Sequence, residues 1–289
     1  LISKILITEQ INNKNISIKN FYQRRIRRII PALLTMIVIS SCLGLLFLSP
    51  TELIEFSRSS LSSISFISNY FFYLSDVQYD AVDSFSKPLL HTWSLSVEEQ
   101  FYIIFPFLII FAFKYIKKEP LFLFLPLFFV SLIVSEIGSH NFSDLNFYSI
   151  HSRFWELLTG FFIAYFEIFK KKKQIFLFNS SVTPTIGLIV LLLSLIFFND
   201  NNPHPSFMTI IPVIGISLII INNNKVSIAN AILSSKIFVF NGLISYSLYL
   251  WHFPLFAYSR ITEFTGGIFW NKILLILTLL ILSILNYFF

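Results

Sequence analysis

Long apolar segments constrain the fold of this chain more than any other feature of its sequence. Several approach the roughly 20 residues that an α-helix needs to cross the hydrocarbon core of a bilayer. Charged residues make up only 12% of the 289 residues, whereas a soluble domain contains about a quarter. We therefore predict an all-α, polytopic transmembrane helix bundle in which residues 1–289 form a single membrane-embedded domain. The predicted membrane helices are eight segments, at about Ile29–Ser49, Val97–Phe113, Leu121–Ile137, Arg153–Phe169, Pro184–Phe198, Phe207–Asn222, Phe238–Tyr258 and Phe269–Phe289.

The basic residues predict how these helices are oriented. Lys and Arg accumulate in the cytoplasmic loops of membrane proteins. If each segment crosses once, all the basic clusters fall on one side, which we take as the cytoplasmic side. An additional crossing at Phe56–Leu74 would place the basic clusters on both sides. We therefore expect Phe56–Leu74 to be an interfacial or re-entrant segment on the outer face. The same clustering beside apolar segments argues against nucleic acid as the reason for the net charge of +6. The clusters are Lys19–Arg28, Lys114–Lys118, Lys170–Lys173, and Lys225 with Lys236.

The stretch from His91 to Pro106, HTWSLSVEEQFYIIFP, is the strongest candidate for a reactive site. Glu98 and Glu99 stand at the edge of a membrane-length segment, where a charge is costly and usually functional. Adjacent residues of a helix point in different directions, so at most one of them faces the interior. Glu98 shares a face with Tyr102, and partial burial would suit it to general acid or base chemistry. The alternative is a carboxylate that caps its own helix or bonds the outer loop.

Four arginines, Arg24, Arg25, Arg27 and Arg28, come immediately before the first long apolar segment. Guanidinium groups three residues apart share a helical face and bind phosphate in a bidentate manner. They would suit a phosphorylated cytoplasmic donor such as a coenzyme A thioester. The alternative is a topological signal that contacts lipid phosphates.

Two later segments carry polar side chains on one helical face. Arg153 and Glu156 lie three residues apart and can neutralise each other, as a substrate contact or as a structural ion pair. Tyr249 and His252 continue a polar stripe that begins at Asn241 and Ser245, and such a stripe normally faces the interior of a bundle. The alternative for His252 is a histidine bonded to a neighbouring helix.

Histidines are too widely spaced along the chain to form a local metal motif, and no motif for nucleotide hydrolysis occurs. We therefore predict no metal site. The single cysteine, Cys42, allows no disulfide within the chain.

Three motifs together resemble the acyltransferase family 3 membrane proteins, which include O-antigen and peptidoglycan O-acetyltransferases. They are the arginine stretch Phe21–Pro31, the stretch His91–Pro106, and the stretch Ser245–Pro254, SYSLYLWHFP. The resemblance covers essentially the whole chain. It implies a ten-helix bundle that passes an acyl group, usually acetyl from acetyl-CoA, across the membrane to a sugar hydroxyl.

The resemblance also implies roles for individual residues. The donor-handling R-x-x-R motif of the family matches Arg25 and Arg28, with Arg24 and Arg27 as the alternative register. The glutamate of its Val-Glu-x-x-Phe-Tyr pattern matches Glu98. Weaker family patterns match Arg153, and Tyr249 with His252. The family's catalytic histidine is expected on a first membrane helix upstream of Leu1. We therefore expect a fragment of a longer chain that lacks this acid/base group, in which a C-terminal SGNH-type domain can follow.

The main hypothesis is a membrane-bound O-acyltransferase of the bacterial inner membrane. It would move an acyl group from cytoplasmic acyl-CoA, used as a substrate with no bound cofactor, to an extracytoplasmic cell-envelope polysaccharide such as lipopolysaccharide. The expected partners are membrane lipids, acyl-CoA and the carbohydrate. A transporter or flippase for a small anionic or glycolipid substrate is the alternative, and a noncatalytic membrane scaffold is a third class. The candidate residues are Glu98 and His252 for catalysis, Arg25 and Arg28 for the donor, and His91, Arg153, Glu156 and Tyr249 for the acceptor side.

Overall fold

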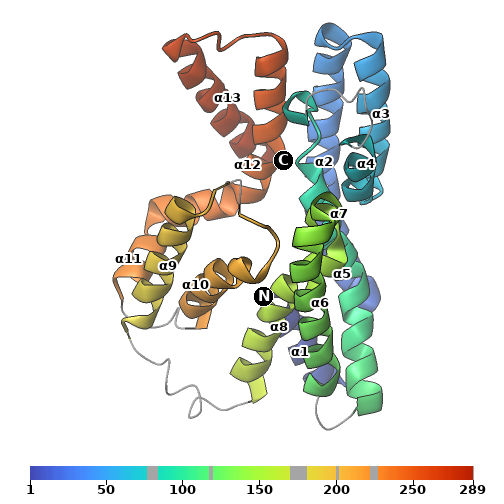
Figure 1. Cartoon of the computed structure of the whole chain (residues 1–289), viewed down its shortest axis with the longest axis vertical. Helices are drawn as coiled ribbons and strands as arrows, with labels where there is room; N and C mark the ends of the chain where they lie inside the picture. The colour runs from blue at the N-terminus through green and yellow to red at the C-terminus, as the bar shows by residue number, and fades with distance from the viewer. Residues whose placement is uncertain (77–83, 117–119, 170–180, 200–201, 222–226, 289) are drawn as a thin grey trace. The chain divides into compact units, whose positions relative to one another are not determined.

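The computed structural model describes residues 1–76, 84–116, 120–169, 181–199, 202–221 and 227–288 (Figure 1). These residues form an all-α structure with no strand among them. The predicted basic residues Lys117, Lys118, Lys170–Lys173 and Lys225 and the segment ends Asn222 and Phe289 lie outside them. The helices are α1 Ile2–Asn13, α2 Ile18–Phe47, α3 Pro50–Ile64, α4 Ser68–Asp76, α5 Thr92–Phe111, α6 Leu121–Asn141, α7 Ser143–Tyr148, α8 Ile150–Phe169, α9 Thr183–Phe197, α10 Ile210–Ile221, α11 Ile228–Leu233, α12 Lys236–Ile261 and α13 Phe269–Phe288.

Each of the eight apolar segments predicted from the sequence is helical in the structure. The helix α2 begins at Ile18, well before the apolar segment, because Lys, Arg and Gln are good helix formers and no proline interrupts the chain before Pro31. The predicted re-entrant segment contains two helices, α3 and α4. They are separated at Phe66, whose φ of 54° lies in the left-handed region and ends the first helix.

Four helices of the described part of the chain are long and apolar enough to cross a membrane. They are Ile18–Phe47, Thr92–Ile116, Leu121–Asn141 and Phe269–Phe288, the second of which joins α5 to the π-helical turn Ala112–Ile116. Thr183–Phe197 and Phe207–Ile221 are shorter apolar helices. The protein is therefore an all-α membrane helix bundle, while eight crossings remain a prediction.

The chain divides into two compact units. The α8 unit comprises Leu1–Ser17 and Phe101–Val239, and the α2 unit comprises Ile18–Gln100 and Phe240–Phe289. The boundaries fall inside α5 and α12, so each of these helices contributes one end to each unit. The sequence did not suggest this division, and a single membrane domain stays a prediction.

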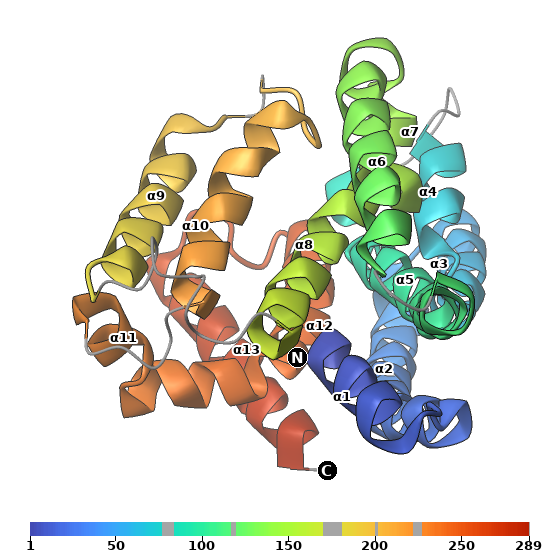
Figure 2. The same cartoon turned by 90° about the horizontal axis from the view of Figure 1, so that it is seen from below.

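In the α8 unit, α6 packs on α8 and α9 packs on α10 (Figure 2). Aromatic rings fill the first contact, where Phe124 and Phe161 have ring centroids 4.0 Å apart and both are fully buried. Glycines allow the second contact, because a Cβ on Gly187 would lie 2.5 Å from the Gly215 carbonyl oxygen. Each contact therefore depends on side-chain size at one level of the helix pair.

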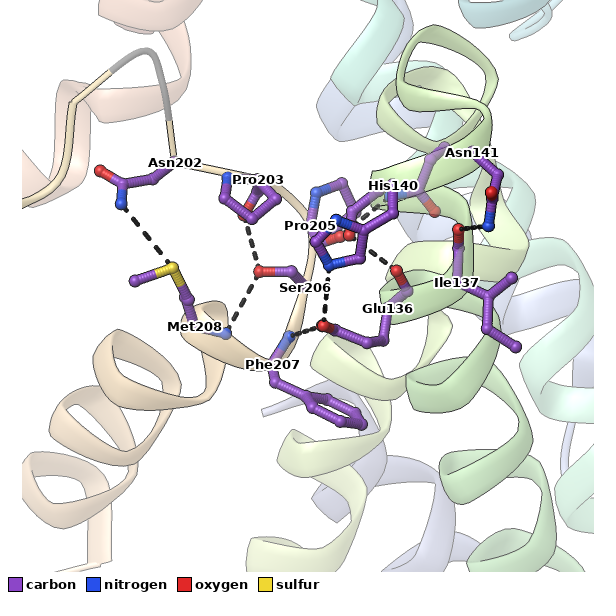
Figure 3. Close-up of polar contacts among 12 residues, drawn as sticks. Glu136, Ile137, His140, Asn141, Asn202, Pro203, Pro205, Ser206, Phe207 and Met208 are labelled. Carbon is purple, nitrogen blue, oxygen red and sulfur yellow. Dashed lines mark hydrogen bonds and ion pairs between the residues drawn. The ribbon is translucent and has the colours of Figure 1, made fainter.

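Glu136, near the end of α6, holds the segment that leads into α10 (Figure 3). One carboxylate oxygen accepts a hydrogen bond from the backbone N–H of Phe207 at 2.7 Å, and the other lies 3.2 Å from Nε2 of His140. The Ser206 hydroxyl donates to the Pro203 carbonyl at 2.6 Å and accepts from the N–H of Met208 at 3.2 Å. These contacts cap the start of this segment, so they have a structural role.

In the α2 unit, two tyrosines of α12 join that helix to the backbone of α2. The Tyr246 hydroxyl donates to the Ile29 carbonyl at 3.1 Å, and the Tyr258 hydroxyl donates to the Ser40 carbonyl at 2.6 Å. Both partners advance in the same chain direction, so the two helices run parallel. Gly44 leaves room for the second bond, because a Cβ there would lie 3.1 Å from the Tyr258 hydroxyl oxygen.

Candidate active site

The first turns of α5 direct polar side chains toward three different partners within the α2 unit. One stripe, Thr92, Ser96 and Gln100, has the four-residue spacing of a single helical face. Its contacts go to the corner between α3 and α4, and they satisfy hydroxyl groups that are fully buried. The hydrogen bonds are Ser63 Oγ to Thr92 Oγ1 at 2.7 Å, Ser68 Oγ to Ser96 Oγ at 2.7 Å, and Gln100 Nε2 to the Phe66 carbonyl at 2.8 Å.

This stripe explains about half of the polar residues in the stretch that begins at His91. They fasten α5 to the corner between α3 and α4, and their role is to position the helix. Of the remaining polar residues, Glu99 contacts α2, His91 and Ser94 contact α12, and Glu98 is exposed; these are the candidates for chemistry.

Glu99 forms an ion pair with Arg25 of α2. The Arg25 Nη2 lies 2.5 Å from Glu99 Oε1, and its Nε donates to Oε2 at 3.3 Å. The two side chains are only 16% and 8% exposed. A two-point guanidinium–carboxylate contact of this kind fixes orientation as well as proximity. It holds the start of α2 against α5.

Glu98, the carboxylate that the sequence favoured for catalysis, is exposed on the surface of the protein. Only one of the adjacent glutamates faces the interior, as the helical geometry predicted, and that residue is Glu99. Glu98 is nevertheless close enough to Tyr249 to act electrostatically on its hydroxyl group. A proton-transfer role for Glu98 stays a prediction.

The other arginines of the cluster are placed differently from Arg25. Arg24, Arg27 and Arg28 are exposed and make no ion pair with any residue that the structure describes. Arg27 and Arg28 follow Arg24 by three and four residues, so all three lie on one face of α2. The structure thus divides the cluster into one paired guanidinium group and three accessible ones.

The third partner of α5 is α12, through Tyr249. The Tyr249 hydroxyl donates its proton to the carbonyl of His91. The Ser94 hydroxyl therefore acts as the donor to Tyr249 Oη, at 2.9 Å. The half-buried His252 contacts the Tyr249 carbonyl through Nδ1 at 2.6 Å. A carbonyl can only accept, so we assign the proton of the neutral ring to Nδ1 and a lone pair to Nε2.

His91 is the most enclosed member of this group, with 5% exposure. Its ring stacks on Phe253 with centroids 5.5 Å apart, and its edge contacts to Tyr249 and His252 span 5.2 and 5.4 Å. Burial, and then the neighbouring His252, lower the pKa of His91 well below 6.5, and a backbone contact to Leu250 only partly opposes this. His91 is therefore neutral at physiological pH.

The ion pair and the histidine group lie close together along α5. Five residues separate Ser94 from Glu99, which is about 8 Å of helix axis. Tyr246, one turn before Tyr249 on α12, lies near both Glu99 and Arg25. We use the name α5 polar cluster for these residues, which are Arg25, His91, Ser94, Glu99, Tyr249 and His252.

The remaining predicted site residues belong to the α8 unit. Arg153 Nη1 lies 3.7 Å from Glu156 Oε2, its Nε donates to the Phe147 carbonyl at 2.9 Å, and its guanidinium group lies over the Phe147 ring at 5.0 Å. Both charged side chains are mostly buried. An acceptor-side role for this pair stays a prediction. The other end of the predicted polar stripe, Asn241 and Ser245, is exposed.

Glu99 and Ser94 were not singled out from the sequence. The spacing of Thr92, Ser96 and Gln100 contained a partial signal, because it assigns one face of α5 to the helix corner and leaves both glutamates on other faces, without distinguishing Glu99 from Glu98. The partner of Glu99 lies 74 positions away, and no local spacing points to it. In the part of the chain that the structure describes, no three His, Cys, Asp or Glu side chains are grouped to hold a metal ion.

Comparison with known proteins identifies the family. A family model described as an acyltransferase domain matches residues 2–286. The chain belongs to this acyltransferase family. It is 28% identical over 300 residues to the peptidoglycan O-acetyltransferase OatA of Listeria monocytogenes, an alignment that covers 99% of this chain and 48% of that protein. The family resemblance expected from the three motifs is therefore confirmed.

The chain is also similar to two further proteins. The chain is 30% identical over 270 residues to the O-acetyltransferase OatA of Staphylococcus aureus, covering 89% of this chain and 44% of that protein. It is 32% identical over 228 residues to an uncharacterized protein of Haemophilus influenzae, covering 76% and 92%. The chain thus spans about half the length of the two O-acetyltransferases. No solved structure matches it.

Proposed function

We propose that this protein is a membrane-bound O-acyltransferase of the bacterial inner membrane. It takes an acyl group, acetyl in our proposal, from acyl-CoA on the cytoplasmic side and transfers it to a hydroxyl of an envelope polysaccharide outside. The names of the Listeria and Staphylococcus relatives support acetyl as the group, and the name of the Listeria relative supports peptidoglycan as the acceptor. The observation that carries the proposal is the α5 polar cluster. His252 in this cluster has a lone pair on Nε2, and the accessible arginines of α2 belong to the same compact unit.

His252 is the proposed general base. Its Nδ1 is engaged by the Tyr249 carbonyl, which leaves Nε2 to take a proton from the acceptor hydroxyl. The hydroxyl oxygen then attacks the thioester carbonyl, the new C–O ester bond forms, and the C–S bond to coenzyme A breaks. The proton held by His252 passes to the departing sulfur as a thiol. Protons and charge therefore balance without any cofactor.

Glu98 and Glu99 have different proposed roles. Glu99 positions α5 through Arg25, so it acts indirectly. Glu98 is accessible and near Tyr249, so it is the proposed second proton-transfer group. His91 and Tyr249 are proposed to line the acceptor side of the cluster. Arg153 and Glu156 are proposed acceptor contacts of the α8 unit.

The donor is proposed to bind through the exposed arginines of α2. Arg28, with Arg24 and Arg27, presents guanidinium groups that suit the phosphates of coenzyme A. Arg25 is already paired with Glu99, so its proposed contribution is to hold this end of α2 in place. This refines the R-x-x-R assignment, in which Arg25 and Arg28 were given equal roles.

A transfer assay with matched variants tests the donor proposal. The intact protein in membranes is supplied with labelled acetyl-CoA and peptidoglycan, and label in the glycan is counted. The double variant Arg27→Ala/Arg28→Ala leaves the buried ion pair intact, so we expect folded protein with a raised KM for acetyl-CoA. The control Glu263→Gln changes an exposed residue of the same unit and should behave as wild type.

An unchanged KM for acetyl-CoA in the arginine double variant would contradict the proposed donor site on α2. Movement of substrate across the membrane without any ester product would favour the transporter alternative. Loss of labelling in Glu263→Gln as well would show that the assay responds to general damage.

A further inference from the structure

A cleft in the α2 unit lies beside the loop that leads to His91. The cleft and the open solvent in front of it together amount to about 310 Å³. The start of α3 forms one wall and the loop at Ser86–Lys87 forms the other. Phe56 and Phe72 are 4% and 1% exposed and form an apolar floor. No residue of this cleft has a part in the mechanism above.

The charged groups of the cleft are arranged around a buried lysine. Lys87 is 5% exposed, and its Nζ lies 3.1 Å from Glu55 Oε1 and 3.2 Å from Ser75 Oγ. Glu52 lies one turn before Glu55 on α3, and one of its oxygens accepts the N–H of Ser49 at 2.8 Å as part of a capping box. Two carboxylates and one ammonium group thus line the cleft, so these three groups together carry a net negative charge.

This chemistry selects against some ligands and favours others. An excess carboxylate repels the phosphates of an acyl donor, so the cleft does not duplicate the arginine face of α2. A hydroxyl group both donates and accepts hydrogen bonds, and carboxylate oxygens are acceptors only. A polar rim of Glu52, Glu55 and Ser86 over an apolar floor therefore suits an uncharged molecule rich in hydroxyl groups.

The loop connects this cleft directly to the α5 polar cluster. Lys87 lines the cleft, Leu89 is 1% exposed, and His91 packs against Tyr249. Four residues separate Lys87 from His91, so their Cα atoms lie at most about 14 Å apart. Arg260 of α12 anchors the other end of the loop by donating to the Phe85 carbonyl at 2.8 Å. A carbohydrate of a few rings can reach from one position to the other.

We infer that this cleft is a subsite for the acceptor carbohydrate, where Glu52 and Glu55 accept hydrogen bonds from hydroxyl groups of a ring next to the one that is acylated. The inference rests on the proposed function and deepens it, because it assigns the part of the protein that selects a glycan. It predicts that the cleft contributes to binding of the acceptor and nothing to handling of the donor.

The test uses variants that keep the fold. Glu52→Gln retains the capping box, since glutamine also serves at that position, and it removes the charge. Glu55→Gln/Lys87→Met removes both members of the Glu55–Lys87 ion pair together, so neither of them is left without the other. Glu263→Gln is the matched control. Binding of an N-acetylglucosamine tetramer to the intact purified protein is measured by calorimetry, alongside the KM values for acceptor and acetyl-CoA.

We expect Glu52→Gln to weaken tetramer binding and raise the acceptor KM by about tenfold, the effect of losing a hydrogen bond to a charged group. The KM for acetyl-CoA and the control should not change. Unchanged acceptor KM and unchanged binding in both cleft variants would overturn the subsite. If wild type transfers no acyl group to any glycan, the proposed function fails. Tetramer binding then still tests the carbohydrate subsite. Weaker binding in Glu52→Gln than in wild type supports the subsite, and equal binding overturns it.

Discussion

Two Arg–Glu ion pairs in the described part of the chain differ in how they are made and in what they can do. Arg153 and Glu156 lie three residues apart on α8, and their closest atoms are 3.7 Å apart. Arg25 and Glu99 come from α2 and α5, 74 positions apart in sequence, and meet at two points, the closer at 2.5 Å. The first pair is local to one helix. The second belongs to the α5 polar cluster and holds two helices together, so tertiary structure depends on it.

The largest difference between the two pairs should appear when one partner is neutralised. Glu99→Gln leaves the Arg25 guanidinium buried without its counter-charge, which we expect to lower the free energy of unfolding by about 3–5 kcal/mol. Glu98→Gln, the same change one residue earlier at an exposed position, should alter stability by less than about 0.5 kcal/mol. Denaturation of the purified variants in detergent measures both. Equal stability of the two would contradict the burial of Glu99.

A smaller effect is expected from the contact between α5 and α12. Tyr249→Phe removes the hydroxyl that bonds the His91 carbonyl and Ser94. The His91 carbonyl then keeps only the longer contacts from the N–H and the hydroxyl of Ser94, each at 3.3 Å, so we expect a cost of about 1 kcal/mol. Tyr73→Phe, a tyrosine change on α4 of the same unit, is the control for loss of a hydroxyl. A Tyr249→Phe variant as stable as this control would show that the hydroxyl does not join the two helices.

The pH dependence of stability should also distinguish the α5 polar cluster from the α8 pair, with a smaller effect. Because the pKa of His91 is lower in the folded protein than 6.5, the unfolded chain binds a proton more readily. The free energy of unfolding should therefore decline as pH falls below 6.5, and no gain from this residue is expected above it. His91→Phe should flatten this slope, as seen in unfolding curves at several pH values. An unchanged slope would mean that His91 is protonated in the fold.

The smallest expected effect is the coupling energy of the α8 pair itself. A double-mutant cycle with Arg153→Met and Glu156→Gln should give less than about 1 kcal/mol, because the two charges meet at a single point with 3.7 Å between their closest atoms. The same cycle on Arg25 and Glu99 should give a larger value, because their contact has two points and lower exposure. A reversal of this order would remove the distinction between the local and the tertiary pair.

These contrasts also show what the sequence could predict. Eight helices followed from apolar length, because burial in a bilayer requires a run of about 20 residues whatever the partners are. The pairing of Arg153 with Glu156 was also accessible, since helical periodicity alone brings them together. The family followed from three motifs that were recognisable without any structure.

The tertiary part of the site was not predictable in the same way. Nothing local distinguishes Glu98 from Glu99, and only the position of α2 decides which of them is buried. Likewise, the role of Thr92 and Ser96 depends on the corner between α3 and α4, which exists because Phe66 interrupts the helix. The cleft at Lys87 required the fold, because its walls come from α3 and a distant loop.

The central claim is that the α5 polar cluster carries out acyl transfer through His252. The most direct measurement is the rate at which label passes from acetyl-CoA to peptidoglycan in membranes containing the intact protein, for wild type and for His252→Gln at equal folded amounts. We expect the rate of His252→Gln to be lower than that of wild type by about a hundredfold or more, the usual contribution of a general base, and Glu263→Gln to keep the wild-type rate. A His252→Gln protein that labels the glycan as fast as wild type would contradict it.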